Sequence, residues 1–145
     1  MKIYLDFDGT VVEHQYPKIG RCNFGCMEVI KKLQDAGHEI ILNTYRVECM
    51  DGSLEAALKH LNEKSWMLTK PTTPNRQDFS LMPITTYTPK KIHPPKWDWD
   101  LIRFWKEMYI DDIADGIPLK PAVMIHGNMV DWDKLDLEFQ DNGIY

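Results

Sequence analysis

Two aspartates among the first ten residues are the strongest candidates for catalysis or metal binding in this chain. They lie in the run Asp6-Phe7-Asp8-Gly9-Thr10. The preceding residues Lys2-Ile3-Tyr4-Leu5 are typical of a short β-strand. Two like charges at the end of a buried strand are costly unless a metal ion or hydrogen-bond donors meet them. The alternative is an acidic turn in which Asp and Gly serve only the turn. We therefore hypothesise that a functional site lies at this strand end.

A second polar strand end follows in the sequence. Apolar residues at helical spacing predict a helix over residues 24–36, and Ile40-Ile41-Leu42 then predicts a strand. Strands joined through a helix run parallel, so their carboxyl ends meet at one edge of the sheet. Thr44 should then lie beside the first two aspartates, where its hydroxyl could donate to a phosphate oxygen. Arg46 is expected either to offer a guanidinium fork to the same anion or to form a surface ion pair.

A third strand end carries two more acids. Met108-Tyr109-Ile110 predicts a strand, and Asp111, Asp112 and Asp115 follow it. Ligands of open parallel sheets bind outside the carboxyl ends of the strands. Polar groups at three such ends favour one shared site over scattered turns.

The other segments position these residues. Residues 11–22 contain Pro17 and Gly20 and predict a loop or small hairpin flap over the first strand. His14, Tyr16, Lys18 and Arg21 of this flap could face a substrate, but we favour a solvated position for each of them. Residues 70–96 are rich in proline and predict a long loop. Further expected elements are a helix over 53–62, a parallel strand over 66–68, a strand near 84–87, a helix over 99–106, a last strand over 122–125 and a closing amphipathic segment over 131–137.

Composition limits the class of protein. A length of 145 residues suits one domain, with 43% hydrophobic and 27% charged residues as in ordinary globular chains. The formal net charge of -5 argues against a general nucleic-acid-binding surface. Three cysteines without zinc-ligand spacing indicate free thiols in a reducing compartment. With no membrane-spanning run or signal pattern, we expect a cytoplasmic protein.

The three strand-end motifs resemble those of the haloacid dehalogenase-like (HAD-like) superfamily of phosphohydrolases. The matching runs are Asp6 to Thr10, Ile40 to Thr44, and Tyr109 to Asp112 with Asp115. The resemblance implies an α/β fold of three Rossmann-like layers around a central parallel β-sheet, within a single domain over 1–145. Only the flap and the loop over 70–96 are available as a cover, which implies a capless or minimally capped member.

The resemblance also implies roles for these acids. Asp6 would be the nucleophile, and Asp8 would be the general acid and then the general base. A magnesium ion would be held by Asp6, the backbone carbonyl of Asp8, and Asp111, with Asp112 or Asp115 assisting. Magnesium prefers such oxygen ligands and shares its coordination shell with substrate phosphate.

The family also places a lysine beside the nucleophile, and four lysines precede the last motif. Lys106 begins the strand that leads to Asp111, so about five residues of strand would separate it from the site by roughly 16 Å. Lys96 is the favoured candidate because it precedes a helix whose start should face the site. Lys91 is the second candidate, and Lys90 remains open.

The expected function is that of a magnesium-dependent phosphatase that forms an aspartyl-phosphate intermediate on a nucleotide or sugar phosphate. The alternatives are a phosphotransferase and a non-catalytic phosphate-binding or regulatory domain of the same fold. The expected partner is a small phosphorylated substrate or a phosphorylated macromolecule, with no membrane involved; the oligomeric state stays open.

Overall fold

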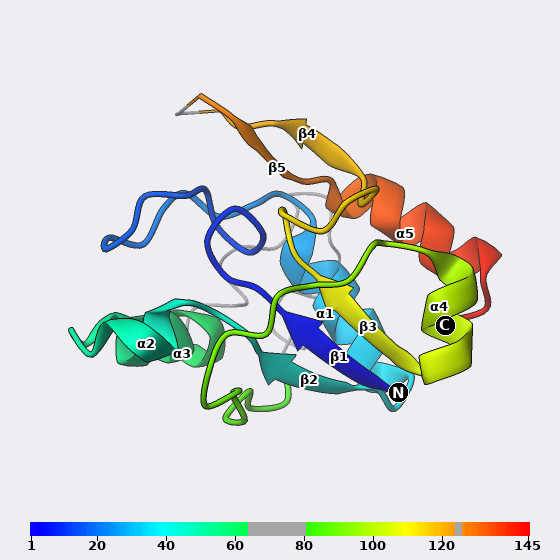
Figure 1. Cartoon of the computed structure of the whole chain (residues 1–145), viewed down its shortest axis with the longest axis horizontal. Helices are drawn as coiled ribbons and strands as arrows, with labels where there is room; N and C mark the ends of the chain where they lie inside the picture. The colour runs from blue at the N-terminus through cyan, green and yellow to red at the C-terminus, as the bar shows by residue number, and fades with distance from the viewer. Residues whose placement is uncertain (64–80, 124–125) are drawn as a thin grey trace.

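A parallel three-stranded sheet forms the centre of the computed structural model, which describes residues 1–63, 81–123 and 126–145. Its strands are β1 (Lys2–Leu5), β2 (Glu39–Leu42) and β3 (Glu107–Ile110), in the order β2-β1-β3 (Figure 1). Ile3 of β1 lies opposite Ile40 on one side and Met108 on the other, and all three side chains are buried. The fold is therefore mixed α/β, with the three carboxyl strand ends at one edge as predicted.

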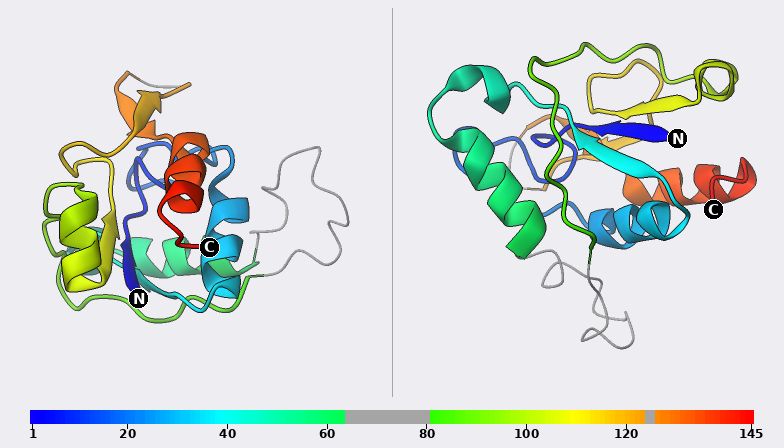
Figure 2. Two further views of the ribbon diagram at one scale, coloured as in Figure 1. Left: turned by 90° about the vertical axis from the view of Figure 1, so that its right-hand side faces the viewer. Right: turned by 90° about the horizontal axis from the view of Figure 1, so that it is seen from below.

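Two helices lie side by side on one face of this sheet (Figure 2). They are α1 (Cys26–Asp35) and α5 (Trp132–Asp141). Each buries an apolar stripe at helical spacing, as Met27, Ile30 and Leu33 in α1 and Trp132, Leu135 and Phe139 in α5. The closing segment is thus a full helix, and Asp131 accepts a hydrogen bond from the Lys134 amide at its N-terminus.

Five further elements complete the described part of the chain. They are α2 (Arg46–Cys49), α3 (Ser53–Glu63), α4 (Trp99–Trp105), β4 (Leu119–Pro121) and β5 (Asn128–Val130). The side chain of Asp98 caps α4 through the amides of Asp100 and Leu101. No helix among the described residues has the length and apolar character needed to cross a membrane.

The loop that carries the first motif is anchored by two side chains from distant parts of the chain. The Trp132 indole donates to the Thr10 carbonyl at 2.8 Å, and the Asn23 amide donates to the same carbonyl at 2.8 Å. The Asn23 amide also reaches the Val130 carbonyl at 2.7 Å. The N-cap of α1 is Gly25, and the Asn23 side chain is used across the fold instead.

The flap of residues 11–22 is a small hairpin. Val12 and Cys22 form a β-bridge, and the Glu13 amide donates to the Arg21 carbonyl at 2.8 Å. Gly20 allows the two arms to close, because a Cβ there would lie 2.0 Å from the Glu13 carbonyl oxygen. The flap therefore has a defined backbone.

The segment after residue 81 runs beside β2. Leu42 and Tyr87 form a parallel bridge, with the Leu42 amide donating to the Thr86 carbonyl and the Thr88 amide to the Leu42 carbonyl, each at 2.9 Å. The strand predicted near 84–87 exists in this reduced form. It brings the chain to the carboxyl edge of the sheet.

Two predicted strands have other outcomes. The strand over 66–68 lies outside the described residues. The strand over 122–125 is wrong in its described part, since the Ala122 amide instead closes an antiparallel hairpin of β4 and β5 by donating to the Gly127 carbonyl at 3.0 Å. Gly127, at φ 114°, adopts a turn conformation that the apolar run does not reveal.

Candidate active site

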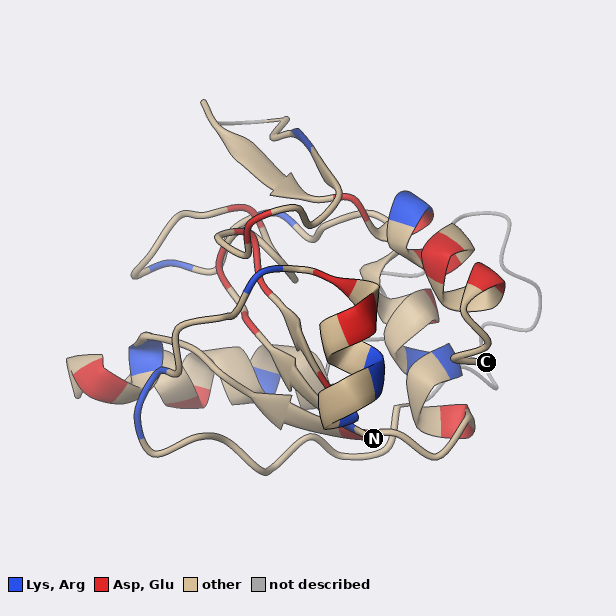
Figure 3. Ribbon diagram, turned by 45° about the vertical axis from the view of Figure 1, so that its right-hand side comes forward, with Lys and Arg blue, Asp and Glu red and all other residues tan. Residues whose placement is uncertain are grey.

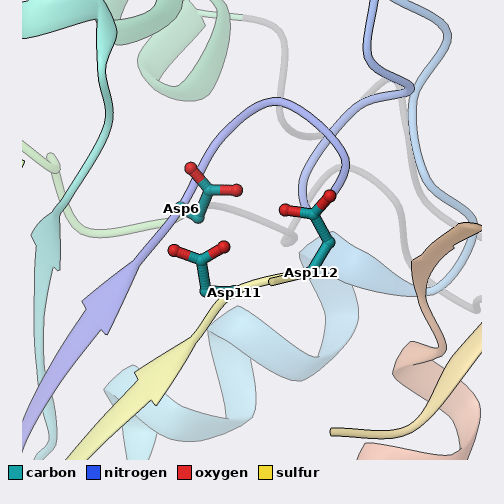
Figure 4. Close-up of side chains that lie close together, drawn as sticks. All are labelled: Asp6, Asp111 and Asp112. Atoms are coloured by element: carbon teal, nitrogen blue, oxygen red, sulfur yellow. The ribbon is translucent and has the colours of Figure 1, made fainter. Parts of the chain in front are cut away.

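Acidic residues cluster along the chain at the carboxyl edge of the sheet (Figure 3). Asp6 follows β1, and Asp111 and Asp112 follow β3. One carboxylate oxygen from each lies within 4.8 Å of the others, and Figure 4 shows the three side chains converging. The structure thus brings together three of the four predicted metal-binding acids.

Asp6 is buried, and both of its carboxylate oxygens are hydrogen bonded. Oδ2 accepts from the Thr10 hydroxyl at 3.0 Å, and Oδ1 accepts from the Lys91 ammonium at 3.1 Å. The Thr10 hydroxyl in turn accepts from the Asp112 amide at 3.2 Å. Thr10 therefore links the first motif to the end of β3 and fixes the orientation of Asp6.

Lys91 is the lysine at this site. Its ammonium also donates to Asp111 at 2.5 Å and to the Asn43 carbonyl at 3.1 Å, so its three donors meet three acceptors. Burial alone would lower the pKa of Lys91, but the carboxylates of Asp6 and Asp111 outweigh it and raise the pKa. Lys91 is therefore a buried cation that holds the nucleophile candidate and a metal-ligand candidate together.

The side chain of Asn43 places Lys91. Its amide donates to the Ile92 carbonyl at 2.9 Å, and its oxygen accepts from the Ile92 amide at 2.8 Å and the Thr88 hydroxyl at 3.0 Å. Asn43 directly follows β2 and is itself buried. The loop that carries Lys91 is thereby tied to the carboxyl end of β2.

The preference for Lys96 over Lys91 is not supported by this arrangement. Lys96 is exposed and lines a separate hollow of about 300 Å³ with Trp97 and Trp105. Lys90 and Lys106 are also exposed, and Lys106 ends α4 immediately before β3. The physical reason is that the chain already reaches the carboxyl edge at Thr88, three residues before Lys91. The signal was available, because the strand predicted near 84–87 ends just ahead of it.

Asp8 is paired with Arg46 rather than grouped with the other acids. Arg46 Nε donates to Asp8 Oδ2 at 2.7 Å, and Nη2 donates to Oδ1 at 2.8 Å. The Arg46 side chain is 0% exposed and that of Asp8 is 11% exposed. This is a buried bidentate pair, which fixes the plane of the carboxylate.

The other donors of Arg46 go to backbone carbonyls. Nη1 reaches those of Pro17 and Ser53 at 3.3 and 3.1 Å, and Nη2 reaches that of Lys18 at 2.9 Å. All five guanidinium N–H groups thus have acceptors within the chain. The sequence predicts that Arg46 either binds a phosphate through its guanidinium or forms a surface ion pair. The structure shows a buried ion pair in place of both. Arg46 instead joins Asp8, the flap and the start of α3.

The other predicted residues divide between the site and its surroundings. Thr44 is buried, accepts from the Arg46 amide at 3.2 Å, and lines the cavity at the site. Asp115 is exposed and outside the group of three acids; its carbonyl accepts from the Trp97 amide at 2.7 Å. The cavity measures about 190 Å³, and its lining is Asp6, Asp8, His14, Tyr16, Thr44, Tyr45, Arg46 and Cys49.

The electrostatics of the three acids suit a divalent cation. Burial, followed by the charge of Asp111, raises the pKa of Asp6 well above its usual value. Burial and the same charge raise the pKa of Asp112 to about 6. The three carboxylates exceed the single ammonium of Lys91 by two formal charges, which one Mg²⁺ would balance with its preferred oxygen ligands.

Gly9 makes room for this arrangement. At φ 81°, it occupies the left-handed region, and a Cβ there would lie 2.4 Å from Asp112 Oδ2. Glycine is therefore required both by the backbone conformation and by the close approach of Asp112.

Comparison with known proteins identifies the fold only. The chain is similar to a solved structure of a conserved protein from Bacteroides thetaiotaomicron, with 24% sequence identity and a TM-score of 0.56. The match covers 97% of this chain and 90% of that one. No protein-family model matches the chain, and the search of curated proteins finds no match. The function is therefore argued from the geometry of the site.

The raised pKa of Asp112 predicts a pH dependence of stability. Its folded pKa of about 6 lies above the reference value of 3.8, so the metal-free folded state binds the extra proton. The protonated Asp112 carboxyl therefore contributes its full stabilisation to the folded state below about pH 4, and this stabilisation is lost as the pH rises through 6. Urea unfolding in EDTA should show a smaller loss between pH 4 and 7 for Asp112→Asn than for wild type. Equal losses would contradict this assignment.

The buried pair predicts a large cost for removing Arg46. Arg46→Met leaves the buried Asp8 charge without its partner, and we expect a loss of about 3–5 kcal/mol in the free energy of unfolding. Arg103→Met is the matched control, because Arg103 pairs with the exposed Asp100 and should cost less than about 1 kcal/mol. Urea unfolding measures both. Similar losses for the two variants would refute the role given to Arg46.

Proposed function

We propose that this chain is a magnesium-dependent phosphomonoesterase of the HAD-like type, with a Rossmann-like three-layer fold. The observation that carries the proposal is the convergence of Asp6, Lys91, Asp111 and Asp112 at one edge of a parallel sheet. A buried carboxylate between a lysine and two further acids is a costly arrangement for a structural turn. It is well suited to a nucleophile that must meet an anionic phosphate.

Asp6 is the proposed nucleophile. One of its oxygens attacks phosphorus, the bond from phosphorus to the leaving oxygen breaks, and the phosphoryl group remains on Asp6 as an aspartyl phosphate. Water then attacks the same phosphorus and releases phosphate, which restores the carboxylate. Thr10 and Lys91 hold the two oxygens of Asp6 in fixed directions, which favours in-line attack.

Asp8 is the proposed acid and base. It gives a proton to the leaving oxygen in the first step and takes one from the attacking water in the second. Both of its oxygens accept from Arg46, so the guanidinium fixes the plane of the carboxylate that would carry this proton. Thr44 follows the neighbouring strand end and lines the same cavity, and its hydroxyl is the proposed donor to a phosphate oxygen.

Asp6, Asp111 and Asp112 fit a magnesium ion by oxygen chemistry and by charge. When bound, the ion supplies the positive charge that reduces repulsion between the carboxylates and an anionic phosphate. Lys91 contributes a second positive charge through its contact with Asp6 Oδ1. Together these groups would stabilise the charge of the phosphoryl group during transfer.

One observation favours a second candidate, a non-catalytic phosphate-binding domain of the same fold. Arg46 occupies both oxygens of Asp8 in a buried pair, which could serve structure alone. Such a domain would bind phosphate and magnesium without turnover.

Turnover of an aryl phosphate separates the two candidates. Wild-type protein with Mg²⁺ should release the phenol, and the rate should fall to the uncatalysed level in EDTA or with Asp6→Asn. The reason is that the variant amide cannot form the aspartyl phosphate. Equal background rates under all these conditions, with retained phosphate binding, would favour the non-catalytic domain.

Two lysine variants provide the internal control. Lys91→Met should lower kcat by about 10²- to 10³-fold, the usual effect of losing one donor that stabilises transition-state charge. Lys96→Met removes an exposed lysine from outside the site and should leave turnover intact. Thermal unfolding of each variant in Mg²⁺ establishes that it is folded. A larger loss with Lys96→Met would overturn the placement of Lys91.

A further inference from the structure

Two tyrosines line the cavity that contains Asp6 and Asp8. Tyr16 belongs to the flap, and Tyr45 lies between β2 and α2. Part of each residue is open to solvent, since Tyr16 is 38% and Tyr45 is 56% exposed. Both rings are therefore accessible to a ligand that enters this cavity.

Each ring already contacts one cation of the site. The Arg46 guanidinium carbon lies 5.3 Å from the centre of the Tyr16 ring, and the Lys91 ammonium lies 5.2 Å from the centre of the Tyr45 ring. The Tyr16 hydroxyl also donates to Asp51. These contacts hold both rings beside the reacting groups while leaving part of each ring exposed.

The charges of the cavity argue for a neutral leaving group. All five N–H donors of Arg46 and all three of Lys91 have acceptors within the chain. The described lining residues otherwise offer acids, tyrosines, a threonine, a cysteine and His14. Among the described residues that line this cavity, a second phosphate on the substrate would therefore meet carboxylates and no lysine or arginine with a free donor.

We propose that the substrate is a phosphate monoester of a neutral alcohol that carries a planar ring, and that this ring stacks on Tyr45 beside the transferred phosphate. The inference rests on the proposed function and adds the class of leaving group. Stacking on a ring that is already held in place costs little conformational entropy. An arylmethyl alcohol and a nucleoside share this chemistry.

Benzyl phosphate and cyclohexylmethyl phosphate test the inference in the presence of Mg²⁺. Both are esters of primary alcohols, so their leaving groups differ mainly in ring planarity. The expected ratio of kcat/KM values is about three- to tenfold in favour of benzyl phosphate, the usual range for an aromatic pair. Tyr45→Leu should abolish this ratio, whereas Tyr45→Phe should retain it. Thermal unfolding establishes that both variants are folded.

The outcomes distinguish this inference from the proposed function. Turnover of both substrates at equal kcat/KM would overturn the stacking site and leave the phosphatase intact. Turnover of neither would overturn the phosphatase and the inference with it. A ratio that survives Tyr45→Leu would also overturn the stacking site. If stacking holds, the kcat/KM for a nucleoside 5′-monophosphate compared with that for benzyl phosphate identifies the source of the ring, since a nucleoside site prefers the former.

Discussion

The buried ammonium of Lys91 is the interaction on which the rest of the site depends. It lies between Asp6 and Asp111, two buried carboxylates on adjacent strands that would otherwise repel each other. Loss of one partner from such a buried group leaves an uncompensated charge at a cost of several kcal/mol. The two hydrogen bonds from the Asn43 side chain to the Ile92 backbone hold the neighbouring Lys91, so its ammonium stays between these carboxylates.

The second buried cation acts differently. Arg46 neutralises the Asp8 carboxylate, and its other N–H groups donate to backbone carbonyls of the flap and of Ser53. A planar guanidinium can bridge several segments in fixed directions, whereas an ammonium is closer to a point charge. Lys91 therefore balances charge at the proposed metal site, and Arg46 determines how the flap sits over Asp8. The same two cations also contact the rings of Tyr45 and Tyr16.

The sequence was informative where one rule applied to several segments. Parallel strands place their carboxyl ends together, and this rule located Asp6, Thr44 and Asp111 at one edge. It also applied to the segment that ends at Thr88, so Lys91 could have been favoured over Lys96. Contacts between distant side chains were beyond prediction. Nothing in the local pattern around Asn23 indicates that it bonds to Val130 rather than capping α1, and the partners of Arg46 span three segments.

The reduced strand beside β2 has a consequence for how the molecule folds. It completes a row of four chain segments that deliver Lys91, Thr44, Asp6 and Asp111 to one edge, and Lys91 is 85 positions from Asp6. Such non-local pairings form slowly, because the entropic cost of closing a long loop comes before any stabilising contact is made. The charge cluster is therefore assembled only when every one of these segments is in register. Any ion or substrate that binds there binds only the folded state, so its binding free energy stabilises the whole sheet against unfolding.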